Sequence, residues 1–457
     1  MSGLFEKRVS RRRFIQGAAT LAVGGAAAAC APPGTSSSGG TSGKKQLRIL
    51  QWNHFVPEYD TWFDKFATDW GNQNKIEVTV DHITNLDLPS RMAAEVAARN
   101  GHDLVEMNSQ ILTYLYEKQF VDMGDMVDYA VKKWGPVLPL GEKLAKVHGH
   151  WAGFPHFYIA IMPQVRPDLF QAVGFDYKTL KTWDDFLTVG RALKNYTGKD
   201  KLGVGFPTGR PAGFAISHCN DANHNWRAMM WAFGASEVAA DGKTITVDTP
   251  EMRTFLKFAQ QFYREALYPD VFAWDDVADN QFLGSGQGGY IHDAISSMRS
   301  LQGKNDALYN TVELHPPVAG PAKPNGISMP DANVYGIWNF APQGNQEAAK
   351  EFLKHLMDHY EESFTQSKLY NMPMYADRFK TNIFPDPKFA VMQDYRGDLL
   401  GTLGYPGPPT YEAIITQTTF VIPDMVQKAV TTSGDSGVQA AIDFAKGRLK
   451  SIYKGVS

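Results

Sequence analysis

Strand and helix patterns alternate from the first apolar run of the chain onward. The segments 45–51, 76–80 and 103–107 have the short apolar or alternating pattern of strands. Between them, 59–70 carries apolar residues at helical spacing and 89–99 is rich in alanine. This succession favours strands that run parallel and are joined by crossover helices. We therefore expect an α/β fold built on a largely parallel sheet.

The α/β pattern begins again after an extended, aromatic and proline-marked segment, 149–162. Thr182 is a suitable N-cap in front of an acidic first turn, so a helix is expected from there to about Tyr196. Further helices are expected over 249–265, 346–359 and 438–453. The chain is therefore expected to contain a second α/β region.

The first thirty residues have the pattern of an export signal. Ser10-Arg11-Arg12-Arg13-Phe14-Ile15 forms a twin-arginine motif, and the uncharged run 17–29 is too short and too weakly apolar to span a bilayer. Small residues then precede Cys30, as at a lipoprotein cleavage site. We interpret 1–30 as a Tat/lipoprotein signal peptide, Cys30 as an acylated membrane anchor, and the Gly/Ser-rich segment 31–45 as a flexible tether.

Charge and cysteine content argue against nucleic-acid binding and against a disulfide-stabilised fold. The formal net charge is −3, so we expect no basic surface and no nucleic-acid partner. With Cys30 acylated, Cys219 has no partner for a disulfide. The 457 residues are enough for two or three domains, whose stability must come from burial of an apolar core.

Short motifs follow one another along nearly all of 45–457. They are the strand and aromatic loop 47–55, Gly101-His102-Asp103-Leu104-Val105, Gly149-His150-Trp151-Ala152-Gly153-Phe154-Pro155, Thr182-Trp183-Asp184-Asp185-Phe186, the segment 241–255, 345–353 and Met372-Pro373. In this order they resemble the motifs of the extracellular solute-binding proteins of family 1, the group of ABC-transporter sugar-binding proteins that includes maltose-binding protein.

The resemblance implies a two-lobed periplasmic-binding-protein-like fold of type II, with discontinuous lobes joined by hinge strands. It implies an N-terminal lobe of 46–156 plus 330–371 and a C-terminal lobe of 157–329 plus 372–457. It also implies a monomer that is exported to the cell envelope, captures a carbohydrate between its lobes and delivers it to the permease subunits of an importer. Such a protein is not an enzyme and needs no cofactor.

A sugar requires flat apolar rings for its C–H faces and uncharged or acidic hydrogen-bonding groups for its hydroxyls. Aromatic and polar residues of these kinds lie where the resemblance places the ligand. The candidate ligand-binding residues are Trp52, His54, Asn108, His156, Tyr158, Trp226, Trp274, Asp293, Asn333, Trp338 and Tyr370.

Other solutes remain open at this point, because relatives in this group also bind polyamines, metals and sugar phosphates. A polyamine site is expected to combine several carboxylates with aromatic rings. A phosphate site is expected to contain arginine or lysine, and Arg210 and Arg227 keep that alternative open.

An exported enzyme is the competing class. Three strings resemble enzyme motifs, but the residues around each of them do not fit the motif. The G-x-G-x-x-G string 284–289 follows an acidic, loop-like stretch instead of a buried strand, so it does not indicate a dinucleotide site. Ser436 lacks an evident base and orienting acid. His355 and His359 are four residues apart without an HExxH glutamate, so no metal site is expected there.

Overall fold

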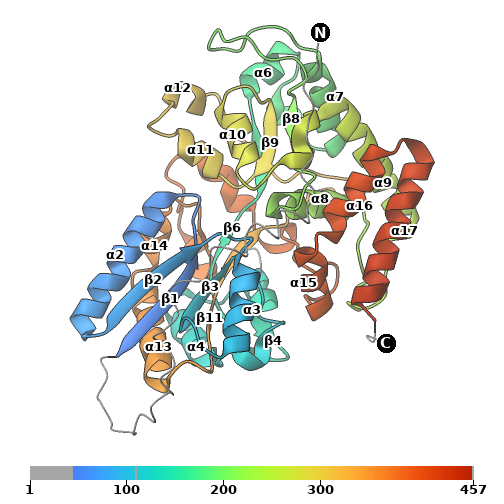
Figure 1. Ribbon diagram of the computed structural model, residues 1–457. Coiled ribbons are helices and arrows are strands. Elements are labelled where there is room, and N and C mark those ends of the chain that lie inside the picture. Colours follow the sequence, from blue (N-terminus) through green and yellow to red (C-terminus); the bar gives the residue numbers. More distant parts are fainter. Residues whose placement is uncertain (1–44, 109–110, 455–457) are drawn as a thin grey trace, which may run out of the picture. The chain divides into compact units, whose positions relative to one another are not determined.

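The computed structural model describes residues 45–108 and 111–454 (Figure 1). The expected signal peptide, Cys30 and nearly all of the expected tether lie outside the described residues. Two main sheets organise the described chain, each with its own helices, and the α/β class expected from the sequence is confirmed.

The larger sheet has six strands in the order β12-β6-β11-β3-β1-β2. Its first three strands along the sequence are parallel, with β1 between β2 and β3, whereas β11 is antiparallel to both β3 and β6. The strands are β1 (Gln46–Trp52), β2 (Glu77–Ile83), β3 (Leu104–Asn108), β6 (Phe154–Ile159), β11 (Asp331–Ile337) and β12 (Met372–Pro373).

Helices from both chain segments of this lobe pack on the sheet. Helix α2 packs on β2, α13 on β1, and α4 and α5 on β6. The helices of this N-terminal lobe are α2 (Pro57–Asn74), α3 (Leu88–Ala98), α4 (Gly124–Trp134), α5 (Pro139–Ala145), α13 (Gln343–Asp358) and α14 (Tyr360–Gln366), with short 3₁₀ turns η1 (Glu117–Gln119) and η4 (Ala376–Lys380) and the hairpin β4 (Lys146–Val147) and β5 (His150–Trp151).

The second sheet has four strands in the order β10-β7-β9-β8 and belongs to the C-terminal lobe. Its strands are β7 (Met162–Val165), β8 (Ala212–Gly213), β9 (Tyr290–Asp293) and β10 (Glu313–Leu314). The helices of this lobe are α6 (Pro167–Ala172), α7 (Trp183–Lys194), α8 (Asn220–Ala232), α9 (Pro250–Ala266), α10 (Ala278–Gly284), α11 (Ser296–Leu301), α12 (Asp306–Tyr309), α15 (Tyr411–Thr418), α16 (Val421–Thr431) and α17 (Gly434–Ile452), with 3₁₀ turns η2 (Tyr177–Thr179), η3 (Pro269–Ala273), η5 (Pro387–Asp394) and η6 (Gly397–Leu399).

The chain crosses between the two sheets more than once, so each lobe is discontinuous. It leaves the larger sheet after β6, enters the second sheet at β7, and returns to the larger sheet with β11. The expected lobe boundary at 156/157 falls inside β6, and β12 begins at the expected boundary 371/372 but pairs with β6 in the larger sheet. These crossings bring residues that are distant in sequence to the junction of the two lobes.

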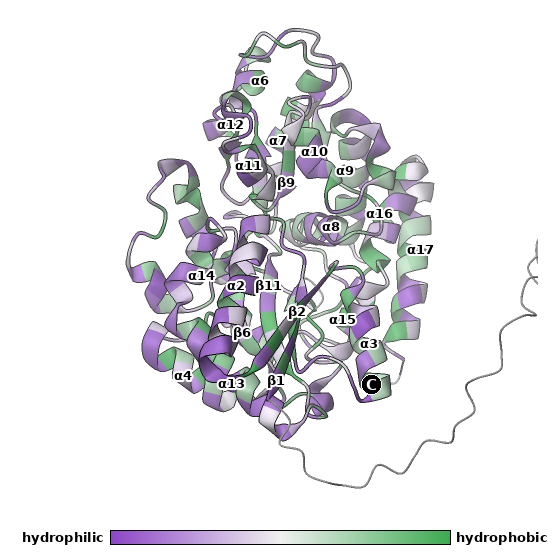
Figure 2. Cartoon of the chain, turned by 60° about the vertical axis from the view of Figure 1, so that its left-hand side comes forward, coloured by the Kyte–Doolittle hydropathy of each residue, from purple (hydrophilic) through white to green (hydrophobic). Residues whose placement is uncertain are grey.

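Helix α8 lies in the middle of the molecule in both Figure 1 and Figure 2, and the sequence pattern did not predict it. All 13 of its residues are buried, although its first half reads Asn-Asp-Ala-Asn-His-Asn. Polar residues of this kind have modest helix propensity and give no apolar stripe. The helix is therefore stabilised by its contacts, and it carries polar side chains into the interior.

Candidate functional site

A cavity of about 280 Å³ lies between segments of the two lobes. The N-terminal lobe contributes the loops that follow the parallel strands β1 and β2, where an open α/β sheet commonly binds its ligand. The C-terminal lobe contributes the segment just before α10. The lining residues of this interlobe cavity are Asn53, His54, Phe55, Thr84, Asn85, Leu86, Asp275, Asp276 and Val277.

Aromatic side chains from distant segments meet beside this cavity. Trp52, the last residue of β1, has its ring centroid 4.2 Å from that of His54 and 6.5 Å from that of Tyr370. Trp52 is 1% exposed and Tyr370 2%. The indole Nε1 of Trp52 is a buried donor without a hydrogen-bond partner. A ligand acceptor at this position would satisfy that donor.

His54 belongs to a buried chain of polar side chains, which runs from Asp60 through His54 to Glu106. Its Nδ1 is hydrogen-bonded to Asp60 at 2.6 Å, and its Nε2 lies 3.6 Å from Oε2 of Glu106. Burial lowers the pKa of His54, and the partial opposing effect of Asp60 does not reverse this. Burial also raises the pKa of Glu106 well above its ordinary value, and the charge of Asp60 adds to that. A neutral His54 can donate or accept a hydrogen bond toward the cavity.

Two further candidates, Asn108 and Asn333, extend this polar chain, and a third, His156, is buried outside it. The Nδ2 of Asn108 donates to Oδ1 of Asn333 at 2.6 Å, and Nδ2 of Asn333 donates to Oε1 of Glu106 at 3.2 Å. His156 is fully buried, neither of its ring nitrogens has a hydrogen-bond partner, and burial together with the charge of His54 lowers its pKa well below the ordinary value. These three residues are fully buried.

Further carboxylates come from the C-terminal lobe and from Asp331, the first residue of β11 in the larger sheet. Asp276 accepts hydrogen bonds from the backbone N–H groups of Asn220 and Asp221 at 2.6 and 3.1 Å. It thereby caps the first turn of α8, where the N-cap residue itself makes no side-chain cap. Asp331 lies 2.8 Å from Nε2 of His224; burial opposes protonation of this histidine, but Asp331 outweighs it and raises the pKa. These two carboxylates are thereby compensated.

Asp293 belongs to a second carboxylate group, together with Asp221 and Asp279. One oxygen of each lies within 4.8 Å of the others, and all three residues are buried. Burial, together with the neighbouring carboxylates, raises the pKa of Asp293 to about 7 and the pKa values of Asp221 and Asp279 well above their ordinary range.

Tyr370 connects the two halves of the site. Its ring approaches Trp52 of the N-terminal lobe, while burial and then the charges of Asp293 and Asp331 raise the pKa of its hydroxyl well above the ordinary value. The structure therefore brings together Trp52, His54, Tyr370 and Asp293 from the sequence-based candidates.

The remaining candidates do not line the interlobe cavity. Trp226 donates from Nε1 to the carbonyl of Ala215, and Tyr158 donates to the carbonyl of Tyr395. Trp338 is stacked on Phe120 and donates to Glu95. The half-buried ring of Trp274 packs on Gly213, Tyr268 and Phe282 in the C-terminal lobe.

Several residues at the site were not among the sequence-based candidates, notably Glu106, Asp221, Asp276 and Asp279. The stretch 275–280 is acidic and reads as a loop, which is the only signal that the sequence offers for two of them. Asp221 lies on α8, which the pattern did not predict. Their convergence depends on tertiary contacts between residues more than fifty positions apart, such as Asn220 and Asp276.

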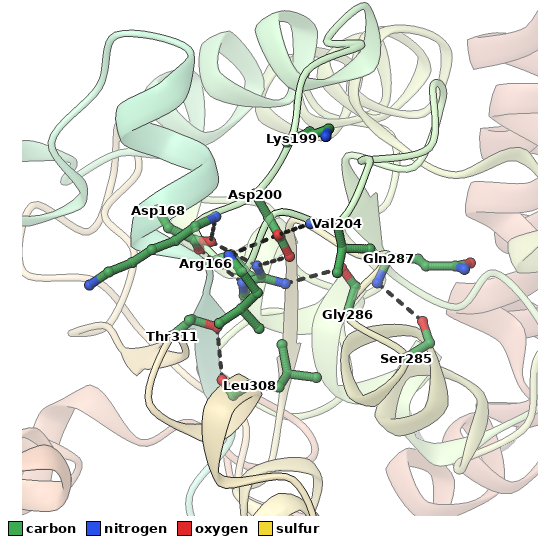
Figure 3. A network of polar contacts seen from close by, with 12 residues as sticks. Arg166, Asp168, Lys199, Asp200, Val204, Ser285, Gly286, Gln287, Leu308 and Thr311 are labelled. Atoms are coloured by element: carbon green, nitrogen blue, oxygen red, sulfur yellow. Dashed lines mark hydrogen bonds and ion pairs between the residues drawn. The ribbon is translucent and has the colours of Figure 1, made fainter.

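A second polar network in the C-terminal lobe, which does not line the interlobe cavity, contains a buried arginine paired with carboxylates (Figure 3). The fully buried guanidinium of Arg166 is paired with Asp168 at 2.8 Å and Asp200 at 3.0 Å, and it donates to the carbonyl of Gly286 at 3.0 Å. The G-x-G-x-x-G string thus contributes a carbonyl that fixes a loop. The charge of Arg166 is matched by those of Asp168 and Asp200, so these contacts stabilise the structure.

The family of the chain follows from a comparison with protein-family models. The model of the bacterial extracellular solute-binding proteins matches residues 61–365. The chain therefore belongs to this family, whose members are exported and bind solutes without catalysing a reaction. No curated protein sequence matches the chain. Among the described residues, none of the helices has both the length and the apolar character that a membrane crossing requires.

Solved structures share the two-lobed fold at low sequence identity. Maltose-bound MalE3 of T. maritima aligns with a TM-score of 0.73 at 17% identity, over 88% of this chain and 99% of that one. A sugar transporter protein of Arthrobacter chlorophenolicus with bound laminaribiose gives 0.74 at 16%, over 89% and 99%. An ABC transporter solute-binding protein of Thermotoga lettingae bound with α-D-tagatose gives 0.72 at 15%, over 89% and 100%.

Proposed function

We propose that this chain is the substrate-binding component of an ABC-type carbohydrate importer, and that it captures a sugar or oligosaccharide in the interlobe cavity. The observation that carries the proposal is the meeting of Trp52, His54 and Tyr370 with the carboxylates of the opposite lobe around that cavity. Aromatic faces suit the C–H surfaces of a sugar, and carboxylate and imidazole groups suit its hydroxyls. The sugars in the three solved structures support the same ligand class.

In this proposal the lobes are 46–156 plus 330–371 and 157–329 plus 372–457, and they close on the ligand by rotation at the crossing strands. The monomer is held at the membrane through acylated Cys30 and the 31–45 tether, and it delivers the sugar to permease subunits. Binding free energy comes from the contacts made on closure and is reduced by the cost of ordering the two lobes.

A sugar phosphate is less well supported than a neutral sugar. Arg227 is fully buried and is held by Glu237 and Asn223 in the C-terminal lobe. Arg210 lies over the rings of Tyr268 and Phe282, at 4.5 and 5.0 Å from their centroids. Neither guanidinium is among the residues that line the interlobe cavity. Phosphate binding would need at least one such cation at the ligand.

Thermal unfolding in the presence of candidate ligands tests the proposal. We expect a raised unfolding temperature with one or more of maltose, laminaribiose, tagatose or larger saccharides, and none with spermidine or glucose 6-phosphate. Stabilisation by spermidine or by the sugar phosphate alone would reject the carbohydrate assignment.

Replacement of Trp52 tests the place of binding. Trp52→Ala should weaken sugar binding by about tenfold or more in calorimetric titration, because the largest ring beside the cavity is lost. Trp70→Ala is the matched control, since Trp70 belongs to the same lobe, is 5% exposed and packs on Phe352. An equal loss of sugar affinity in the two folded variants would show that Trp52 does not mark the binding site.

A further inference from the structure

The carboxylates of Asp221, Asp279 and Asp293 converge from three different elements of the C-terminal lobe. Asp221 is in the first turn of α8, Asp279 is in α10, and Asp293 ends β9. One oxygen from each side chain lies within 4.8 Å of the other two. Because the three side chains belong to separate elements, the fold itself imposes the approach of these carboxyl groups.

The cluster lacks the compensation that the same lobe provides for other buried charges. Oδ2 of Asp221 and Oδ2 of Asp293 have no hydrogen-bond partner, although these residues are only 8% and 4% exposed. Within the described residues, no lysine or arginine forms an ion pair with any of the three. Arg166 in Figure 3 and His224 at Asp331 show matched pairs instead.

We propose that Asp221, Asp279 and Asp293 bind a hard divalent cation such as Ca²⁺. Carboxylate oxygens are the ligands that this ion prefers, at about 2.3–2.6 Å from the metal. Around such an ion, neighbouring ligand oxygens are about 3.4 Å apart and opposite ones about 4.8 Å. The three oxygens lie within 4.8 Å of one another, which is compatible with a shared ion, and two of the side chains have an oxygen free to coordinate.

The composition of the cluster selects the class of metal. Three carboxylates without cysteine or histidine favour calcium, magnesium or manganese over zinc or copper. A divalent ion also offsets more of the negative charge than a monovalent group. The burial of all three residues suits a small ion better than the end of a bulky solute. The proposal goes beyond sugar binding, because it requires no sugar.

Calcium binding to the chelator-treated full chain tests the inference directly. We expect calorimetric titration with CaCl₂ to show one site per chain and thermal unfolding to shift to higher temperature. Asp279→Asn and Asp293→Asn should each weaken binding by about tenfold or more. Asp270→Asn is the matched control, because Asp270 is an exposed carboxylate of the same lobe and should leave binding unchanged.

The two variants should fold without the metal, because asparagine has the shape of aspartate and brings no charge into a site where burial already disfavours the carboxylate form. Their metal-free unfolding temperatures should equal or exceed that of the parent. Absence of binding by Ca²⁺, Mg²⁺ and Mn²⁺ to the folded chain would overturn the inference, as would unchanged binding in both variants. Stabilisation by glucosamine but not glucose, with no response to the metals, would assign the cluster to an ammonium group instead. These results do not depend on whether maltose or laminaribiose binds.

Discussion

Individual buried charges in this protein differ in how they are compensated. The imidazole of His102 in the N-terminal lobe is hydrogen-bonded to Glu95 at 2.5 Å and to Asp81 at 2.9 Å. Burial alone would lower its pKa, but the two carboxylates outweigh burial and raise it. The fully buried ring of His156 has no such partner, and its pKa falls. Residue identity therefore says little about protonation until the neighbours are known.

His102 gives a prediction with a defined dependence on pH. Because its pKa is raised on folding, its protonation stabilises the fold fully below the unfolded value of about 6.5, and this contribution is lost as pH rises through the folded pKa. His102→Asn should therefore cost most near pH 6, about 2 kcal/mol, and less at pH 8.5. Urea unfolding across this range measures the difference.

The exposed His148 provides the control for this titration, since its side chain is 78% exposed. His148→Asn should change stability little at either pH. A cost of His102→Asn that stays constant from pH 6 to pH 8.5 would show that the charge of His102 contributes nothing.

The helices differ in how far the sequence predicts them. Helix α7 begins where Thr182 and the acidic residues after it indicated, and a complete capping box forms: Oγ1 of Thr182 accepts from the backbone of Asp185 at 3.2 Å, and Asp185 accepts from the backbone of Thr182 at 2.9 Å. Helix α8 has no such cap from its own N-cap residue. Its first backbone N–H groups are instead bonded by Asp276, which lies in a loop distant in sequence. Local signals thus predicted α7, and only the tertiary fold reveals α8.

The capping box can be tested by itself. Thr182→Ala removes the side-chain acceptor and should lower the free energy of unfolding by about 1 kcal/mol, whereas Thr182→Ser keeps the acceptor and should retain most of it. The midpoint of urea unfolding compares the two variants. Equal losses in both would mean that the methyl group of Thr182, rather than its hydroxyl, stabilises the start of α7.

For the whole molecule, the strand–helix rhythm and the order of the short motifs were enough to predict two α/β lobes. The candidate site was only partly predictable. Trp52 and His54 were proposed because aromatic and polar residues at the end of a strand are conspicuous, and the structure places their rings together with Tyr370, whereas Trp338 gives the same signal and stacks on Phe120 inside one lobe. Asp293 was among the sequence-based candidates, but its neighbours Asp221 and Asp279 were missed because separate elements create their cluster.

Membrane attachment is a property of the whole chain that the sequence alone suggests. If Cys30 is acylated, Cys30→Ala should shift the exported protein from the membrane fraction to the soluble fraction, because the lipid is then missing. Mass spectrometry of the parent chain should show the added lipid on the peptide that begins at Cys30. An unmodified Cys30 in the exported protein would contradict the anchor.

The central claim is that the two lobes hold a sugar between them without altering it. A crystal structure with the most stabilising saccharide of the thermal screen tests this most directly. We predict an intact saccharide between the lobes, against Trp52 and Tyr370 on one side and within hydrogen-bond distance of Asp276 on the other. A saccharide bound outside the interlobe cavity, or recovered in cleaved form, would contradict the account.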